Sequence, residues 1–294
     1  MLTERPSPRF ADIDVWEPAE VLEAMIGGQF AAVAAVRTAL PAIARAALAM
    51  EPRLRQGGRL IYAGAGTSGR LAVQDGAELM PTFGWPRERL LLLIAGGGAA
   101  MMQAVEGAED QVGRGAELGD VGDRDVMLAV AASGTTPFTL SCLREAKRRG
   151  ALTIGIANNP NTPLLSDAEH GIFLDTGAEP IAGSTRMNAG TAQRITLSLL
   201  STLVMIRLGH VYRGLMVDVQ AANSKLTRRK RDMLRHLSGS CEEEVEQALL
   251  RADGNVKLAV LLLKGCSLEA ARSILERARG ELRAAIDLAV ANKS

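Results

Sequence analysis

Five short apolar segments alternate with helical stretches along the first two thirds of this chain, and this alternation strongly constrains the fold. The segments are 60–63, 90–95, 126–131, 152–157 and 172–174. Continuous apolar runs of this length fit strands that are buried on both faces of a sheet, and parallel strands require a long connection, usually a helix, between them. The sequence therefore predicts a doubly wound α/β fold with a five-stranded parallel sheet.

Helical patterns precede and follow the predicted sheet. The first 56 residues are rich in alanine, and we expect helix breaks at Gly27, Gly28 and near Pro41. The later predicted helices are 184–208, 215–237, 242–251, 256–264, 268–278 and one at the C-terminus, with a linker at 238–240. We therefore predict two domains, an α/β domain with N-terminal helices over 1–237 and a small helical bundle over 238–294.

Composition excludes several classes of function. The formal net charge is +1 and both signs are mixed along the chain, so we expect no surface for nucleic acid or an anionic membrane. The most apolar stretch, 195–206, is too short to span a bilayer, and the N-terminal residues do not have the pattern of a signal peptide. We therefore expect a globular, cytoplasmic protein.

Cysteine and histidine residues give no metal or disulfide pattern. Cys142, Cys241 and Cys266 are odd in number and far apart, and we expect them to be reduced core residues. The three histidines are also too scattered to suggest a ligand cluster. We therefore predict no metal site.

A glycine-rich segment follows the first predicted strand. Gly64, Gly66 and Gly69 would let backbone N–H groups approach an anion, and Thr67 and Ser68 add hydroxyl donors where a helix could begin. The glycines match the pattern G-x-G-x-x-G, but Phe83, Gly84 and Trp85 stand about 20 residues later, where a dinucleotide site usually has an acidic residue. The spacing alone leaves a phosphorylated small molecule, a dinucleotide and a simple tight turn open.

A second hydroxyl-rich segment follows the third predicted strand. Ser133, Gly134, Thr135 and Thr136 stand just beyond the end of that strand, as the first segment stands beyond its own. Ligands of doubly wound sheets bind outside the carboxyl ends of the strands. Both segments therefore point to one edge of the sheet.

Ser184 and Arg186 open the helix predicted after the fifth strand. They could face the same phosphate, and Ser184 could equally be only the N-cap of that helix. Ser68 and Ser133 are poor candidates for nucleophiles because neither stands in a G-x-S-x-G sequence. Their hydroxyl groups are better suited to holding phosphate.

Carboxylates are the remaining candidates for catalysis. Glu78 lies in an apolar sequence, where burial would favour the protonated form that a general acid needs. Glu109 shares a predicted helical face with Glu106, whereas Asp110 would point elsewhere. The residues alone leave Glu106 and Glu109 open as the second catalytic acid or base.

Five sequence blocks, taken together, resemble the N-acetylmuramic acid 6-phosphate etherase family. The blocks are 64–71, 75–78 with 81–84, 104–110, 132–137 and 183–187. The resemblance runs from about residue 10 to the C-terminus. It implies a sugar isomerase (SIS) type domain, a C-terminal bundle similar to a ubiquitin-associated domain, a sugar phosphate substrate and no cofactor.

The resemblance also implies a reaction. In the open-chain aldehyde of N-acetylmuramic acid 6-phosphate the C2 proton is acidic, and the D-lactyl ether oxygen on C3 can leave. In the family's scheme the residue matching Glu109 removes the proton, and the residue matching Glu78 protonates the departing lactate. Water then adds at C3 and gives N-acetylglucosamine 6-phosphate. The family usually has lysine where this chain has Asn188, which would remove one possible anion contact.

Distance limits this scheme. An unbroken helix from Ser68 to Glu78 would separate the two by about 15 Å. Either the helix ends early, near Gly76 and Pro81, or a second chain completes the site. The resemblance to SIS-type proteins implies a second chain, because these proteins pair to complete their sites. We therefore expect a homodimer. A sugar phosphate isomerase, or a non-catalytic sugar phosphate sensor resembling the glucokinase regulatory protein, remains an alternative function.

Overall fold

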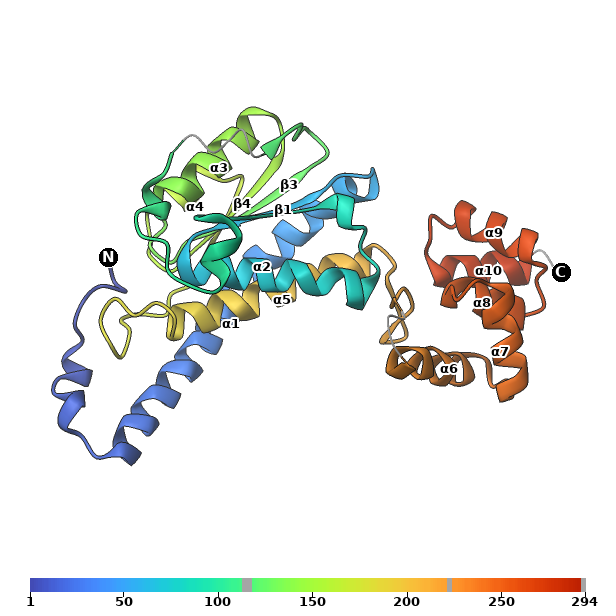
Figure 1. The fold of residues 1–294 in the computed structure, drawn as a ribbon, viewed down its shortest axis with the longest axis horizontal. Helices are drawn as coiled ribbons and strands as arrows, with labels where there is room; N and C mark the ends of the chain where they lie inside the picture. Colours follow the sequence, from blue (N-terminus) through green and yellow to red (C-terminus); the bar gives the residue numbers. More distant parts are fainter. Residues whose placement is uncertain (113–117, 221–223, 292–294) are drawn as a thin grey trace. The chain divides into compact units, whose positions relative to one another are not determined.

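The computed structural model describes residues 1–112, 118–220 and 224–291, and it divides into two compact units (Figure 1). The first unit comprises Met1–Ala77 and Glu88–Val204, and the second comprises Glu78–Arg87 and Met205–Ser294. This division differs from the predicted boundary at residue 237. The reason is that apolar side chains between residues 212 and 237 pack into one core with those of the C-terminal helices.

The first unit contains a five-stranded parallel sheet with the strand order β2-β1-β3-β4-β5. The strands are β1 (Leu60–Gly64), β2 (Leu90–Ile94), β3 (Val126–Val130), β4 (Leu152–Ala157) and β5 (His170–Phe173). Strands β1, β3 and β4 are buried along their whole length, as their continuous apolar sequences predict. The predicted α/β fold and its five strands are confirmed.

Helices cover both faces of this sheet. They are α1 (Pro18–Arg55), α2 (Gly66–Phe83), α3 (Pro137–Arg148), α4 (Pro163–Asp167) and α5 (Asn188–Arg207), with 3-10 turns η1 (Pro8–Phe10), η2 (Ile13–Val15), η3 (Arg87–Arg89), η4 (Gly97–Met101) and η5 (Ala108–Asp110). Figure 1 shows α3 and α4 on one face and α1, α2 and α5 on the other. The strand order explains why the helices lie on opposite faces. The connection from β1 to β2 runs toward one edge of the sheet and the connection from β3 to β4 toward the other, and both connections are right-handed.

Helix α1 is one continuous helix of 38 residues, so the predicted breaks at Gly27, Gly28 and Pro41 are wrong. Its buried residues recur every three or four positions from Ala32 to Leu54, and this stripe lies against β3, β4 and β5. Packing of an apolar stripe supplies most of the stability of a helix in a protein. It therefore offsets the loss of the hydrogen bond that the proline nitrogen does not donate.

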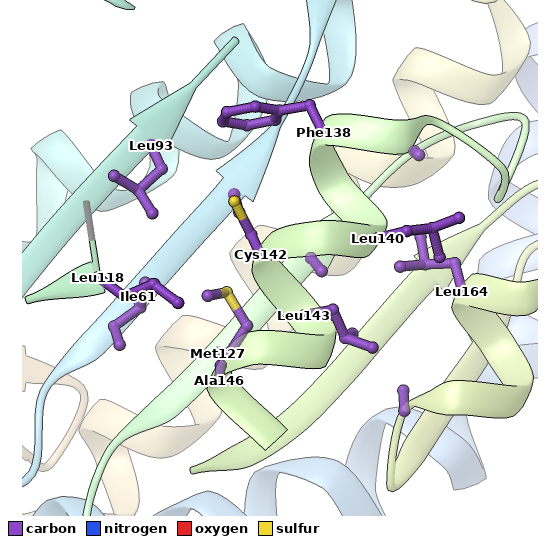
Figure 2. Close-up of a cluster of buried hydrophobic side chains, with 14 of the residues drawn as sticks. Ile61, Leu93, Leu118, Met127, Phe138, Leu140, Cys142, Leu143, Ala146 and Leu164 are labelled. Carbon is purple, nitrogen blue, oxygen red and sulfur yellow. The ribbon is translucent and has the colours of Figure 1, made fainter. Parts of the chain in front are cut away.

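Figure 2 shows the apolar core between α3 and the sheet. Phe138 and Cys142 of α3 lie with Ile61 of β1 and Met127 of β3, and all four side chains are fully buried. Cys142 is therefore a core residue, as predicted. Cys241 is exposed, which contradicts the prediction for that residue.

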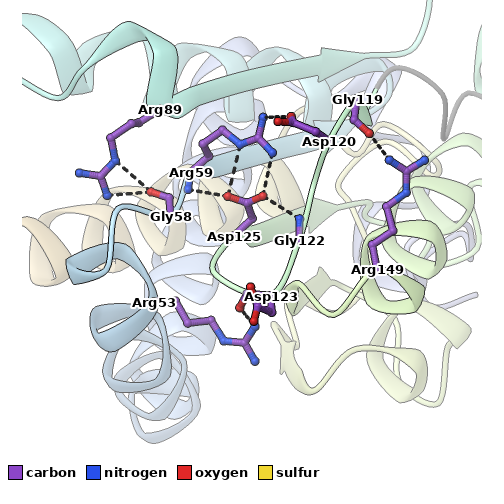
Figure 3. Close-up of polar contacts among 10 residues, drawn as sticks. All are labelled: Arg53, Gly58, Arg59, Arg89, Gly119, Asp120, Gly122, Asp123, Asp125 and Arg149. Atoms are coloured by element: carbon purple, nitrogen blue, oxygen red, sulfur yellow. Dashed lines mark hydrogen bonds and ion pairs between the residues drawn. The ribbon is translucent and has the colours of Figure 1, made fainter.

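A polar network lies at the amino ends of the strands (Figure 3). Arg59, directly before β1, donates from Nη2 and Nε to the carboxylate of Asp125, directly before β3, over 2.8 and 3.3 Å. The Arg59 backbone N–H also donates to Asp125 Oδ1 at 2.8 Å. Arg89 donates from Nε to the Gly58 carbonyl at 3.0 Å. These guanidinium groups hold the starts of the strands together.

A second buried network joins α2 to β1 and α5. Asp75 of α2 accepts hydrogen bonds from the Tyr62 hydroxyl at 3.0 Å and from the Ser201 hydroxyl at 3.3 Å. Burial raises the pKa of Asp75 above its usual 3.8, although these hydrogen bonds and Arg194 oppose the rise. The carboxyl group therefore gains a proton more readily in the folded chain than in the unfolded chain.

The Asp75→Asn substitution should change how stability depends on pH. A carboxyl group whose pKa is raised by folding stabilises the folded state at pH values below its pKa in the unfolded chain. This contribution is lost as the pH rises through its pKa in the folded chain. Asparagine stays neutral, so the variant should gain free energy of unfolding relative to the wild type between about pH 4 and about pH 7. Urea unfolding at both pH values measures this, and parallel pH profiles for the two proteins would contradict it.

The second unit combines a short hairpin with a helical bundle. Its elements are β6 (Val211–Tyr212), β7 (Leu215–Met216), α6 (Ser224–Ser238), α7 (Glu242–Arg251), α8 (Val256–Leu263), α9 (Leu268–Arg277) and α10 (Leu282–Ala291). The helix predicted over 215–237 is therefore wrong in its first part. Arg213 and Gly214 have φ of +49° and +77°, and two left-handed residues make the tight turn that joins β6 to β7.

Candidate active site

A cavity of about 370 Å³ opens beyond the carboxyl ends of β1 and β3. The chain leaves β1 toward β2 and leaves β3 toward β4, so the cavity lies where the strand order reverses. Open α/β sheets bind their ligands at this position. The polar side chains that line the cavity are hydroxyls from Thr67, Ser68, Ser133, Thr135, Thr136 and Thr185, and carboxylates from Glu4, Glu109 and Asp110.

The start of α2 forms one wall of the cavity. The helix begins at Gly66 directly after β1, so the N–H groups of its first turn have no acceptor within the helix and carry its positive dipole end. Ser68 in this turn is only 7% exposed. Gly69 does not line the cavity; a Cβ there would stand 2.7 Å from the Gly64 carbonyl oxygen, so Gly69 lets α2 approach β1. This wall can bind an anion such as phosphate.

The loop after β3 forms the facing wall. Ser133 Oγ accepts a hydrogen bond from the Thr135 N–H at 3.2 Å and lies 3.2 Å from Thr136 Oγ1. Gly134 does not line the cavity, and its carbonyl accepts from the Leu164 N–H at 3.0 Å. The loop therefore turns its hydroxyl groups toward the cavity while its backbone is bonded to the protein behind it.

Replacing Gly134 by alanine should destabilise the protein strongly. Gly134 has φ of +68°, and a Cβ there would stand 2.2 Å from Thr162 Oγ1. Gly107 has a similar φ of +66° with open space around it, so Gly107→Ala is a matched control for backbone strain alone. We expect a loss of about 1–2 kcal/mol for the control and about 1–3 kcal/mol more for Gly134→Ala. Denaturant unfolding measures both, and equal losses would contradict the steric argument.

The structure distinguishes Glu106 from Glu109. Gly107, in a left-handed conformation, separates them, so the prediction that both share one helical face is wrong. Glu109 lies in η5 and lines the cavity, whereas Glu106 lines only a neighbouring space of about 270 Å³. Asp110 also lines the cavity, contrary to the prediction that it points elsewhere. Glu109 therefore stands with the hydroxyl groups of the cavity, and Glu106 does not.

Glu78 does not line this cavity and is exposed on α2. Helix α2 runs without a break through Gly76 and Pro81 to Phe83, so the predicted early end of the helix is wrong. At the rise of an α-helix, ten residues separate Ser68 from Glu78 by about 15 Å. The desolvation predicted for Glu78 is also absent in the single chain.

The segment before α5 contributes Thr185 to the cavity, but Ser184 and Arg186 do not line it. The segment is fixed by Glu179, whose buried carboxylate accepts the N–H groups of Asn188 at 2.8 Å and Ala189 at 2.9 Å. Burial raises the pKa of Glu179, and these two N–H groups oppose the rise. No sequence pattern indicates that Glu179 holds the start of this helix.

Asn188 faces α1 instead of the cavity. Its Oδ1 accepts a hydrogen bond from Gln29 Nε2 at 3.3 Å, and a Cβ on Gly28 would stand 2.5 Å from it. The side chain is 2% exposed and does not line the cavity. The side chain at residue 188 therefore does not face the cavity, and the structure does not support the prediction that Asn188 removes an anion contact there.

Glu4 also lines the cavity, and no sequence pattern predicts it there. It lies far from the two glycine- and hydroxyl-rich segments along the chain, and no local pattern marks it. With Glu109 and Asp110 it gives the cavity three carboxylates. Within 1–112, 118–220 and 224–291, however, no group of three histidine, cysteine, aspartate or glutamate side chains is arranged to hold a metal ion.

Two family models match this chain. The model described as glucokinase regulatory protein N-terminal SIS domain matches residues 42–147, and the SIS domain model matches residues 99–206. A putative phosphosugar isomerase involved in capsule formation from Bacteroides fragilis has a similar fold, with a TM-score of 0.50 and 20% identity over 67% of this chain and 95% of that chain. The matched ranges include both walls of the cavity.

Relatives of higher identity cover almost the whole chain. An N-acetylmuramic acid 6-phosphate etherase from Deinococcus radiodurans is 47% identical over 96% of this chain and 93% of its own length. One from Streptomyces avermitilis is 45% identical over 97% of this chain and 93% of its own length. The chain therefore belongs to the N-acetylmuramic acid 6-phosphate etherase family.

Proposed function

We propose that this protein cleaves the C3 ether of N-acetylmuramic acid 6-phosphate and releases D-lactate and N-acetylglucosamine 6-phosphate, as a carbon–oxygen lyase of cell-wall amino sugar catabolism. The observation that carries the proposal is a single cavity in which Glu109 stands with the first turn of α2 and the hydroxyl-rich loop after β3. An anion site and a base in one cavity fit a phosphorylated substrate that loses a proton.

The substrate phosphate would bind between the two walls. Thr67 and Ser68 on one side and Ser133, Thr135 and Thr136 on the other offer hydroxyl groups, and the α2 dipole favours negative charge. Glu109 would then remove the C2 proton of the open-chain sugar, and the resulting carbanion would expel the ether oxygen from C3. Addition of water at C3 completes the reaction, and no cofactor is needed.

Glu78 would protonate the departing lactate from a second copy of the chain. The unbroken helix leaves Glu78 about 15 Å along α2 from the phosphate site of its own chain. A homodimer is supported by an exposed apolar stripe on α1 formed by Leu22, Ile26, Phe30 and Val33. Exposed apolar surface of this kind is typical of a protein interface.

Helices α1 and α5 reach the length and mean hydropathy of a membrane span, at 1.4 and 1.2. We assign both helices to packing and subunit contact, because α1 lies on the sheet and 56% of the apolar window of α5 is buried. A cytoplasmic location, without a membrane or nucleic acid partner, is part of this proposal. The near-neutral formal charge of +1 supports it.

A sugar phosphate isomerase is the second candidate, and one observation favours it. Glu109 lines the cavity of a single chain but Glu78 does not, and an aldose–ketose isomerase needs a base but no acid at a C3 leaving group. Such an enzyme would move the C2 proton and release no lactate. Lactate release therefore separates the two functions.

The deciding experiment is incubation of the purified protein with N-acetylmuramic acid 6-phosphate and an enzymatic assay for D-lactate. The unphosphorylated sugar is the matched control substrate. We expect lactate only from the phosphorylated sugar, because the cavity binds the phosphate. Equal release from both sugars would refute the phosphate site, and no release from either would refute the ether cleavage.

The Ser68→Ala substitution should raise KM for the sugar phosphate and leave kcat nearly unchanged. The phosphate is remote from the C2 and C3 atoms, so its contact with the Ser68 hydroxyl is equally strong before and during the reaction. Loss of one hydrogen bond to a charged group should raise KM about 10-fold or more. A fall in kcat at constant KM in initial-rate kinetics would contradict this assignment.

A further inference from the structure

We propose that Glu4 is a further substrate-contacting residue, whose carboxylate accepts hydrogen bonds from hydroxyl groups of the bound sugar phosphate. The inference rests on the proposed sugar phosphate substrate and does not depend on ether cleavage. Glu4 lines the same cavity as Ser68, Ser133 and Glu109, although it comes from the N-terminal segment of the chain.

The residues before Glu4 are bonded firmly to the rim of the cavity. Asn159 Oδ1 accepts the Leu2 N–H at 2.6 Å, and Asn159 Nδ2 donates to Thr3 Oγ1 at 2.9 Å and to the Ala132 carbonyl at 2.9 Å. Both Thr3 and Asn159 are buried. Ala132 immediately precedes Ser133, so this anchor ties the N-terminal segment to the hydroxyl-rich loop.

A second anchor also involves Thr3, directly before Glu4. The Thr3 carbonyl accepts the Gly183 N–H at 2.9 Å, and Gly183 leads into Thr185, which lines the cavity. A Cβ on Gly183 would stand 2.9 Å from Glu4 Oε2, so the carboxylate lies against the bare Cα of this glycine. The two anchors place the Glu4 carboxylate between the loop after β3 and the start of α5.

Short hydrogen bonds join Leu2 and Thr3 to Asn159, and a further one joins Thr3 to Gly183, so the segment before Glu4 is held in place. The Glu4 carboxylate itself has no hydrogen-bond or ion-pair partner among the described residues. Fixing the backbone of each residue costs conformational entropy. The buried anchors offset this cost and hold the exposed Glu4 carboxylate at the cavity, without a partner in the part of the chain that the structure describes.

The chemistry of a carboxylate identifies the part of the ligand that it contacts. An ionised carboxylate only accepts hydrogen bonds, and it repels a phosphate that lies in the same cavity. The phosphate is therefore better placed at the first turn of α2, away from Glu4. The neutral hydroxyl groups of the sugar chain are donors, and they are the groups that Glu4 can bind.

Calorimetric titration with N-acetylglucosamine 6-phosphate and, separately, with inorganic phosphate tests this assignment without requiring turnover. Glu4→Gln should weaken binding of the sugar phosphate about 10-fold, because a charged acceptor becomes neutral. The same substitution should strengthen binding of inorganic phosphate about two- to five-fold, because a like charge is removed. Glu4→Asp keeps the charge but shortens the reach, so it should weaken the sugar phosphate and leave inorganic phosphate unchanged.

Asp14→Asn is the matched control, since it removes one exposed charge from the same N-terminal segment outside the cavity. It should change neither affinity. Opposite shifts for the two ligands in Glu4→Gln would support the inference, since a purely structural N-terminal segment would change both affinities in the same direction or neither. Parallel or absent shifts would overturn it. If the wild-type protein binds no sugar phosphate, the proposed function is refuted as well. If the wild-type protein binds the sugar phosphate and Glu4→Gln shows no opposite shifts, only the role of Glu4 is refuted.

Discussion

Replacing Glu109 by glutamine should remove both lactate release and exchange of the substrate C2 proton with solvent. Glu109 lines the cavity together with its hydroxyl groups, and glutamine cannot take up the C2 proton. We expect kcat to fall by about 10²–10⁴-fold. Proton exchange in deuterated water, followed by NMR, and a lactate assay measure the two steps on the same sample.

Glu106→Gln is the matched control for this substitution. It removes the same charge three residues earlier, but Glu106 does not line the cavity. We expect its exchange and lactate release to remain within about three-fold of the wild type, as a change in surface charge alone would give. Normal C2 exchange in Glu109→Gln, with loss of exchange in Glu106→Gln, would show that the base has been assigned to the wrong residue.

Replacing Glu78 by glutamine should separate the two steps. Removal of the C2 proton does not require lactate to leave, so the variant should keep some C2 exchange while lactate release falls by about 10²–10⁴-fold. The carbanion can take a deuteron back from solvent, but glutamine cannot protonate the ether oxygen. The same NMR and lactate assays measure this. Loss of exchange here, together with retention of exchange in Glu109→Gln, would mean that the two roles are reversed.

The sheet was predictable because its strands are buried on both faces. The apolar runs at 60–63 and 126–131 are short and lie between helical stretches, which is typical of buried parallel strands. They form β1 and β3. Helix breaks were less predictable. Gly28 and Pro41 are helix breakers by local propensity, but the apolar stripe of α1 on the sheet stabilises the helix through Pro41, and Gly28 is buried against Asn188.

The position of the two hydroxyl-rich segments was also predictable, because a loop that follows a buried parallel strand has a known place at the sheet edge. The acidic residues were harder. The conformation of Gly107, which separates Glu106 from Glu109, cannot be read from a helical spacing. Glu4 reaches the cavity only through tertiary hydrogen bonds to Asn159 and Gly183, and residues so distant in sequence leave no local signal.

A mixed dimer of Glu78→Gln and Glu109→Gln chains tests whether two chains share one site. Each chain would carry a different affinity tag, and purification on both tags would isolate the mixed dimer. If Glu109 of one chain works with Glu78 of the other, the mixed dimer holds one intact site and one doubly substituted site, and it should release lactate at about half the wild-type rate. If both residues serve a site within one chain, every site carries one substitution. A mixed dimer no more active than either parent variant would therefore contradict the shared site.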